Sequence, residues 1–176
     1  MRVLTQKPVL FTFIWLMLSF LALWSFSSNK TTAFDTDGRL ALAASKAKFD
    51  AHFTGWVKQY SPDLRDTTVH FTAGDCWCEH IAAPHINSVK QLTQEQNGKN
   101  IDIKISGTPQ ITSFIPATPA VAVFNKQEQL VYFGPYSTGL FCTQSNGLVE
   151  KFIAGQISPQ IAATVLMEAN GCYCAT

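Results

Sequence analysis

Two cysteines stand one residue apart at Cys76 and Cys78, within the segment GDCWCEH that covers residues 74–80. Cysteines at such short spacing form disulfides, bind metals or act as redox centres. A Cys76–Cys78 disulfide would cross-link almost no chain and would add little stability. Its small ring would also be strained and easily reduced. The spacing therefore predicts a redox-active pair rather than a structural cross-link.

The segment after the pair indicates which cysteine is the reactive one. Apolar residues recur at helical spacing over residues 79–96, so Cys78 is expected in the first turn of a helix. The free N–H groups and the positive end of the dipole at a helix start favour a thiolate. A protonated His80 would assist, whereas the acidic neighbours would oppose it. We therefore predict that Cys78 is the attacking thiol and Cys76 the resolving one.

A metal site is the alternative interpretation of the same segment. Cys76, Cys78, His80 and His85 offer thiolate and imidazole ligands that suit Cu(I). The protein would then be a copper(I)-binding chaperone. In the preferred interpretation it binds no metal or other cofactor, and a third alternative is a non-catalytic interaction domain.

Three further cysteines bring the count to five, which leaves at least one thiol unpaired within the chain. Cys172 and Cys174 repeat the one-residue spacing in the C-terminal segment NGCYCAT. Gly171 is expected to end a helix and to leave this tail exposed. The simplest expectation is one structural disulfide that joins Cys142 to either tail cysteine.

The elements that position these cysteines alternate between strand and helix patterns. A strand before the pair and a strand after its helix should be parallel, because a helical crossover joins them. A hairpin and a C-terminal helical region follow, which indicates an α/β domain with a mixed sheet. An extra helix, for which Asp37 is a plausible cap, precedes the first strand. The predicted strands are 67–73, 100–106, 120–125 and 129–134, and the predicted helices are 39–60, 79–96 and 147–167 with an interruption at SP.

The order β-α-β-loop-β-β-α resembles that of the thioredoxin-like superfamily, and two motifs carry the resemblance. WCEH at residues 77–80 resembles the start of the Trp-Cys-x-x-Cys signature. Thr118-Pro119, directly before the hairpin, stands where that superfamily carries a cis-proline that faces the active site. The resemblance implies a thioredoxin-like fold, a nucleophilic Cys78, and substrate contacts by Trp77, Thr118 and Pro119.

The sequence departs from the family pattern at one position. The second cysteine of the signature would fall at residue 81, which is Ile81. The assignment of Cys76 as its replacement follows from its position and not from the resemblance.

The N-terminus carries an uncharged apolar run of 18 residues, from Val9 to Phe26, preceded by basic residues. This length reaches the lower limit for a membrane-spanning helix and exceeds the usual apolar region of a signal peptide, about 7–15 residues. We expect an uncleaved single-pass anchor in the inner membrane, with the N-terminus cytoplasmic and the domain in the oxidising periplasm. The predicted parts are a cytoplasmic segment (1–8), an anchor (9–26), a polar tether (27–38) and a thioredoxin-like domain (39–176).

The charge of the chain bears on its partners. Thirteen Lys and Arg against twelve Asp and Glu give a net charge of +1, with no basic cluster, which argues against nucleic-acid binding. The predicted function is that of a membrane-anchored thiol–disulfide oxidoreductase. Its expected partners are client protein thiols or disulfides and a membrane partner that regenerates the redox centre.

Overall fold

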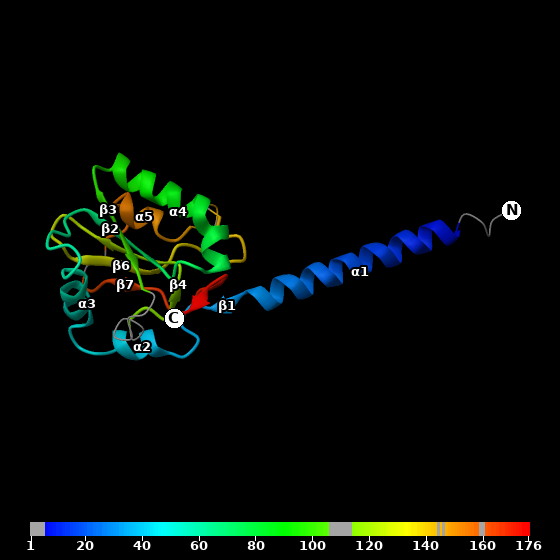
Figure 1. The fold of residues 1–176 in the computed structure, drawn as a ribbon, viewed down its shortest axis with the longest axis horizontal. Helices are drawn as coiled ribbons and strands as arrows, with labels where there is room; N and C mark the ends of the chain where they lie inside the picture. Colours follow the sequence, from blue (N-terminus) through cyan, green and yellow to red (C-terminus); the bar gives the residue numbers. More distant parts are fainter. Residues whose placement is uncertain (1–5, 106–113, 144, 146, 159–160) are drawn as a thin grey trace.

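The computed structural model describes residues 6–105, 114–143, 145, 147–158 and 161–176. A long N-terminal helix, α1 (Gln6–Lys30), extends away from a domain in which a mixed sheet lies between helices (Figure 1). The structure thus has the predicted α/β class, with one apolar helix ahead of the domain.

The central sheet has five strands in the order β3-β2-β5-β6-β7. The first two strands along the chain are parallel and are joined through α4 (Trp77–Glu95), as predicted. The predicted hairpin β5–β6 is antiparallel, and β5 also pairs antiparallel with β2. The strands are β2 (Thr67–Thr72), β3 (Lys99–Lys104), β5 (Ala120–Phe124), β6 (Leu130–Pro135) and β7 (Thr164–Val165).

Both faces of the sheet are covered, which explains why its central strands are apolar almost throughout. Phe71 of β2 packs in the same cluster as Phe53 of α3 (Phe49–Val57), on one face. Val121 and Val123 of β5 face the opposite way and pack with residues of α4. Figure 1 shows α4 and α5 (Glu150–Ile153) on one side, with α2 (Arg39–Ala44) and α3 on the other.

The helix predicted over 39–60 is divided into α2 and α3, so a single helix is wrong. The chain adopts a left-handed conformation at Lys48, φ 67°, which interrupts the helix. The predicted cap is also wrong, because Asp35 and not Asp37 serves α2. The Asp35 carboxylate accepts hydrogen bonds from the N–H groups of Leu40 (3.1 Å) and Ala41 (2.8 Å).

The C-terminal region differs most from its prediction. Of the helical region predicted over 147–167, only the short α5 is helical among the described residues, and residues 159–160 lie outside the description. Thr164 and Val165 instead form β7, which pairs parallel with β6. An open sheet edge next to two β-branched residues favours strand pairing over a helix here.

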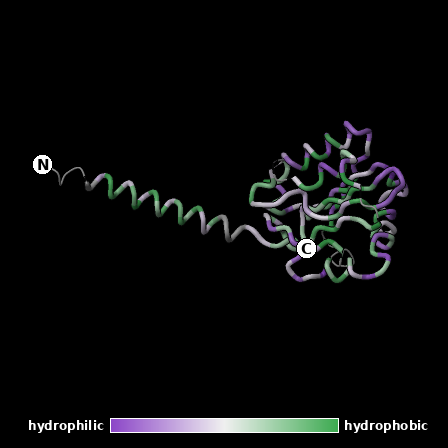
Figure 2. Tube along the Cα trace, turned by 180° about the vertical axis from the view of Figure 1, so that it is seen from behind, coloured by the Kyte–Doolittle hydropathy of each residue, from purple (hydrophilic) through white to green (hydrophobic). Residues whose placement is uncertain are grey.

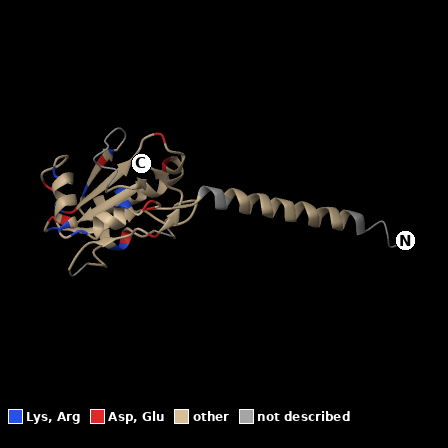
Figure 3. Cartoon of the chain, turned by 90° about the horizontal axis from the view of Figure 1, so that it is seen from below, with Lys and Arg blue, Asp and Glu red and all other residues tan. Residues whose placement is uncertain are grey.

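Helix α1 is long and apolar enough, by length and composition, to cross a membrane. The qualifying span is Pro8–Phe26, whose side chains are unburied; an N-terminal signal sequence would satisfy the same criterion. Figure 2 shows hydrophobic residues along α1, and Figure 3 shows the charged residues gathered on the domain. Residues 1–5 of the predicted cytoplasmic segment lie outside the described residues.

The segment expected to be a tether contributes to the domain at its C-terminal end. Helix α1 continues to Lys30, and β1 (Thr32–Ala33) pairs antiparallel with β8 (Asn170–Gly171). Phe34 is buried and packs edge-on against Tyr173. The end of α1 therefore lies close to the C-terminal tail, because β1 follows α1 almost immediately and pairs with β8.

A buried polar network joins β2 to β3 and to the residue that follows β6. Tyr136 donates its hydroxyl proton to Nδ1 of His70 (2.5 Å), and Nε2 of His70 donates to the Asn100 side-chain oxygen (2.8 Å). Loss of solvent lowers the pKa of His70 to about 4, so this imidazole is neutral in the folded protein at neutral pH. Its role is structural, because both ring nitrogens are used in these bonds.

Candidate functional site

The cysteine pair lies at the junction between β2 and α4. Cys76 is the cap residue, in an extended conformation, and α4 begins at Trp77. The Cys76 carbonyl accepts from the N–H groups of Glu79 (3.1 Å) and His80 (3.4 Å). Cys78 is therefore in the first helical turn, as predicted, where the unpaired N–H groups favour a thiolate.

Glu79 holds the loop that leads into this helix. One carboxylate oxygen accepts from the N–H of Ala73 (2.5 Å) and the other from the N–H of Gly74 (3.0 Å). Gly74 has φ 99°, and the Lys104 side chain lies where a β-carbon would be placed. The Lys104 side chain is flexible and could move aside, but the positive φ strains any other residue, so the loop geometry before the cysteines favours glycine here.

The C-terminal tail lies directly against this junction. Its last strand, β9 (Cys174–Ala175), pairs antiparallel with β4 (Ala117–Thr118), with Thr118 opposite Cys174. Before β9, the N–H of Cys172 donates to the Gly139 carbonyl (3.2 Å). The tail is therefore held by backbone hydrogen bonds on both sides of its cysteines.

Two disulfides join the tail to the start of α4. Cys76 pairs with Cys174, 98 residues away, with a Cα–Cα distance of 6.3 Å. Cys78 pairs with Cys172, 94 residues away, with a Cα–Cα distance of 5.3 Å. Both distances lie in the ordinary range for disulfides.

The structure corrects three predictions about the cysteines. Cys76 and Cys78 are bonded to the tail and not to each other, because the docked tail brings a second cysteine pair alongside the first. Cys142 is free and buried, although it was expected to pair with Cys172 or Cys174. It packs instead in the apolar cluster under α4, where burial raises the pKa of its thiol. The tail is also not exposed, since Cys172 is fully buried.

The four bonded cysteines form one compact sulfur cluster. The sulfur atoms of Cys76, Cys78 and Cys174 all lie within 4.8 Å of one another. Cys172 joins them through its bond to Cys78, and Leu140 packs beside the sulfurs. A thiolate released at one bond is therefore close to the sulfur atoms of the other bond.

Of the predicted substrate-contacting residues, Thr118 lies opposite Cys174 in the β4–β9 pair. The Thr118–Pro119 peptide bond is cis, which confirms that prediction. Thr118 is buried, and its hydroxyl has no hydrogen-bond partner among the residues described. Trp77 is about half exposed next to the bonded Cys78.

The histidines of the alternative copper site are not part of the sulfur cluster. His80 is exposed at the start of α4. His85 is buried, and its Nε2 pairs with a carboxylate oxygen of Glu150 at 2.5 Å. Within the described chain, the cysteines alone form the group that fits metal ligation.

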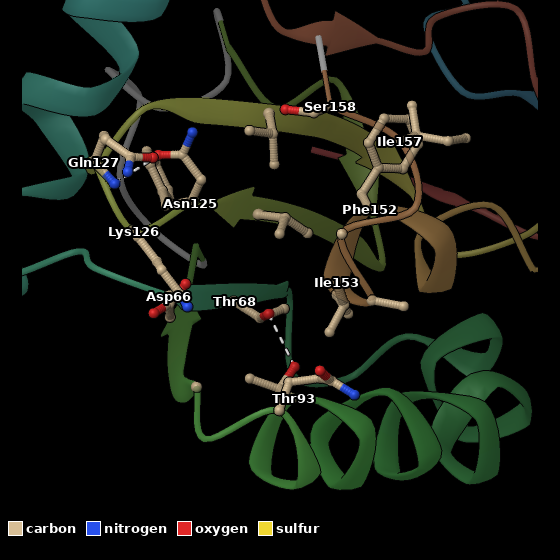
Figure 4. A pocket seen from close by; sticks show the side chains of 17 residues that line it. Asp66, Thr68, Thr93, Asn125, Lys126, Gln127, Phe152, Ile153, Ile157 and Ser158 are labelled. Carbon is tan, nitrogen blue, oxygen red and sulfur yellow. Dashed lines mark hydrogen bonds between the residues drawn. The ribbon is translucent and has the colours of Figure 1, made fainter.

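A pocket on the domain lies away from the cysteines. Figure 4 shows Thr93 near the end of α4 donating to the Thr68 hydroxyl of β2, with Asn125 and Lys126 opposite. The cysteines flank the other end of α4, about 25 Å away for a helix of this length. This pocket is not part of the candidate site.

A family model described as a domain of unknown function, DUF6436, matches residues 45–176, which include all five cysteines. The chain therefore belongs to that family. Neither the comparison with curated proteins nor the comparison with solved structures finds a match.

Proposed function

We propose that this DUF6436 protein is a membrane-anchored thiol–disulfide oxidoreductase with a thioredoxin-like domain. The observation that carries the proposal is the pair of disulfides between the start of α4 and the tail, beside the cis Thr118–Pro119 bond. Four cysteines in one cluster can exchange bonds without a large movement of the backbone.

The topology supports the thioredoxin-like part of the proposal. A parallel β-α-β unit is followed by an antiparallel hairpin, in the sheet order β3-β2-β5-β6. The cis-proline directly precedes the hairpin, and the reactive helix follows the first strand of the unit. This is the arrangement that the resemblance to the thioredoxin-like superfamily implies.

Exchange begins at the outer bond, Cys76–Cys174, because Cys174 is partly exposed whereas Cys172 is fully buried. A client thiolate attacks the Cys174 sulfur, the bond to Cys76 breaks, and Cys76 leaves as a thiolate. A second client thiol, as its thiolate, displaces Cys174. The client gains a disulfide, and the protein gains two electrons and two protons.

The inner bond is reached from within the cluster. The Cys76 thiolate attacks the Cys78 sulfur, breaks the Cys78–Cys172 bond and forms a Cys76–Cys78 disulfide, with Cys172 leaving as a thiolate. The predicted pair is then a transient intermediate rather than the resting bond. In the reverse direction Cys78, placed at the helix start, attacks a client disulfide.

The proposed location is the inner membrane, with the domain in the periplasm. The apolar helix α1 and the basic residues before it support this orientation. β1 follows α1 in the chain and pairs with β8 of the tail, so the cysteine cluster lies at the end of the domain from which α1 extends (Figure 1). This position suits a membrane-embedded dithiol or disulfide protein as the regenerating partner.

A redox titration of the full chain in detergent tests the function. The protein is equilibrated with dithiothreitol buffers of defined potential, and its free thiols are then alkylated. Mass spectrometry counts the alkylated cysteines at each potential. We expect four cysteines to titrate and Cys142 to stay reduced throughout. The midpoint potentials should lie above about −300 mV, below which structural disulfides of secreted proteins typically fall.

Turnover provides the second measurement, because a reducible bond alone is not an activity. The full chain should catalyse disulfide formation in a reduced unfolded protein, with a Cys76→Ala and Cys78→Ala double variant as the control. Midpoints below about −300 mV without turnover would show that the two bonds are only structural.

A further inference from the structure

We propose that the reduced protein binds one soft metal ion, Zn²⁺ or Cu⁺, through the thiolates of Cys76, Cys78 and Cys174, with Cys172 as the fourth ligand. The site uses the same four cysteines as the proposed redox centre, in their reduced state, but its existence does not require that the protein be an oxidoreductase. It also differs from the copper site expected from sequence, because no histidine takes part.

The sulfur positions carry the proposal. Three sulfur atoms lie within 4.8 Å of one another, and the fourth is bonded to one of them. In a tetrahedral site with metal–sulfur distances of about 2.3 Å, two ligand sulfurs are about 3.8 Å apart. Once the S–S bonds are broken, side-chain rotation can bring the sulfurs of Cys76, Cys78 and Cys174 to this separation, and Cys172, released from Cys78, can rotate in as the fourth ligand.

The surroundings suit thiolate ligands. Cys76 and Cys78 are buried, Cys172 is fully buried, and Leu140 limits the access of water. The start of α4, a helix of 19 residues, presents N–H groups and a positive dipole end to the anionic sulfurs. The nearest acidic side chain on the helix, Glu79, is committed to the N–H groups of the preceding loop.

Two pairs of cysteines, each with one intervening residue, come from two separately anchored segments. The start of α4 fixes one pair; in the other, the β4–β9 pairing holds Cys174 and the hydrogen bond to the Gly139 carbonyl holds Cys172. A site whose ligands are placed by backbone elements needs little reorganisation when the metal binds. Thiolate ligands select Zn²⁺ and Cu⁺ over hard cations such as Mg²⁺ and Ca²⁺.

The chemistry balances as follows. Reduction of the two disulfides takes four electrons, supplied in the experiment by two equivalents of a phosphine, and four protons, supplied by two water molecules whose oxygen atoms end in the phosphine oxide. The metal then displaces the thiol protons, so that four cysteines and one Zn²⁺ release four protons. Binding is therefore expected to weaken at low pH and after reoxidation.

The test uses the full chain in detergent, reduced with phosphine under anaerobic conditions and titrated with Co²⁺ as a spectroscopic probe. We expect one Co²⁺ per chain, with the absorption of a tetrahedral all-thiolate site, and displacement by Zn²⁺. A parallel titration with Cu⁺ uses a coloured chelator as competitor. The oxidised chain should bind neither metal.

Matched variants identify the ligands. Cys174→Ser should lower affinity at least ~100-fold, since even loss of a group that only orients a ligand costs about 10–100-fold. Cys174→His, which restores a ligand, should recover binding with a shifted spectrum. Cys142→Ser, and His80→Ala combined with His85→Ala, should bind as the wild type does.

The fourth position separates the two metals. Cys172→Ser leaves three thiolates, which should retain Cu⁺ but weaken Zn²⁺ and Co²⁺, because structural zinc sites take four ligands. No saturable binding by the reduced wild-type chain would overturn the proposal. It would also be overturned if the histidine variant lost the metal while Cys174→Ser kept it. Neither result bears on turnover, so failure here is distinct from failure of the oxidoreductase function.

Discussion

At the scale of single residues, four cysteines form disulfides and the fifth, Cys142, has a free thiol. Cys76 and Cys78 are held to the tail, and Cys142 packs in the core. The difference follows from the neighbouring backbone, because only the four bonded cysteines lie where two chain segments meet. The reactivity of Cys76 and Cys78 toward client proteins should therefore depend on which of the tail cysteines, Cys172 or Cys174, is removed.

We predict that Cys172→Ser accumulates mixed disulfides with client proteins. The substitution leaves Cys78 at the helix start without its partner, so an intermolecular bond to Cys78 is resolved slowly. Adducts should be visible on non-reducing gels and disappear with reductant. Cys142→Ser is the control and should show none, while adding Cys78→Ser to Cys172→Ser should abolish the adducts. Adducts that persist without Cys78 would contradict the assignment of this thiol as the nucleophile.

We also predict that stability falls as the pH is lowered from about 6.5 to about 4, the interval between the ordinary pKa of His70 and its folded value. Because the folded pKa is lowered, the unfolded chain binds more protons in this interval, and acid favours unfolding. The loss approaches about 3 kcal/mol for this shift.

Denaturant unfolding of the full chain at several pH values measures the effect. His70→Gln removes the imidazole, so its free energy of unfolding should depend less on pH across this interval. An equal slope in both proteins would show that another group is responsible.

At the scale of elements, the tail strand β9 is the part that completes the site. It pairs with β4 and carries Cys174, while Cys172, which forms the second disulfide, lies just before it. Tyr173, between the two cysteines, donates its hydroxyl to the Ser137 carbonyl at 2.7 Å. The tail is thus a packed element of the domain.

We expect the two disulfides to stabilise the fold non-additively. Either bond closes a loop of nearly 100 residues, and closing such a loop contributes about 4 to 5 kcal/mol. Once one bond is present, the other closes only a few residues and adds about 2 kcal/mol.

A double-mutant cycle tests this coupling. Cys76→Ala with Cys174→Ala removes the outer bond, and Cys78→Ala with Cys172→Ala removes the inner one. Removing both bonds should cost more than the sum of the two separate losses, and wild-type protein in reductant should match that variant. Additive losses would contradict a shared loop.

At the scale of the whole molecule, the apolar helix and the cysteine cluster are joined through one short segment. Thr32 pairs with Gly171, immediately before Cys172. The cluster is therefore held close to the end of α1. If α1 spans a membrane, the cysteine cluster lies near the bilayer surface.

We predict that a fusion of alkaline phosphatase after Thr176 is active, because this enzyme needs an oxidising compartment for its disulfides. The N-terminus of the isolated protein should be that of the full chain, since we expect an uncleaved anchor. A fluorescent reporter that is active in the cytoplasm, fused at the same position, is the counterpart. If the phosphatase fusion is inactive and the fluorescent fusion is bright, the orientation is the reverse of the one we expect. A mature N-terminus near Phe34 would leave the orientation intact but replace the anchor by a signal peptide.

Local patterns in the sequence determined much of the central architecture. The β2–α4–β3 unit, the β5–β6 hairpin, the apolar N-terminal helix and the cis bond before Pro119 were all predictable. The first three depend on residues that are close in sequence, through side-chain periodicity and turn residues, whereas the cis bond was expected from the resemblance to the thioredoxin-like superfamily. The position of Cys78 in the first helical turn was predictable from the local periodicity as well.

The partners of the cysteines were decided only by the tertiary structure. The partner of Cys76 is 98 residues away along the chain and that of Cys78 is 94 residues away, and nothing local to either cysteine identifies its partner. The same is true of Thr164 and Val165, which become a strand because β6 offers them an edge. Pairings between distant segments depend on where the whole chain places its edges. For that reason the sequence alone indicated cysteine chemistry, and only the docked tail showed that four cysteines share one site.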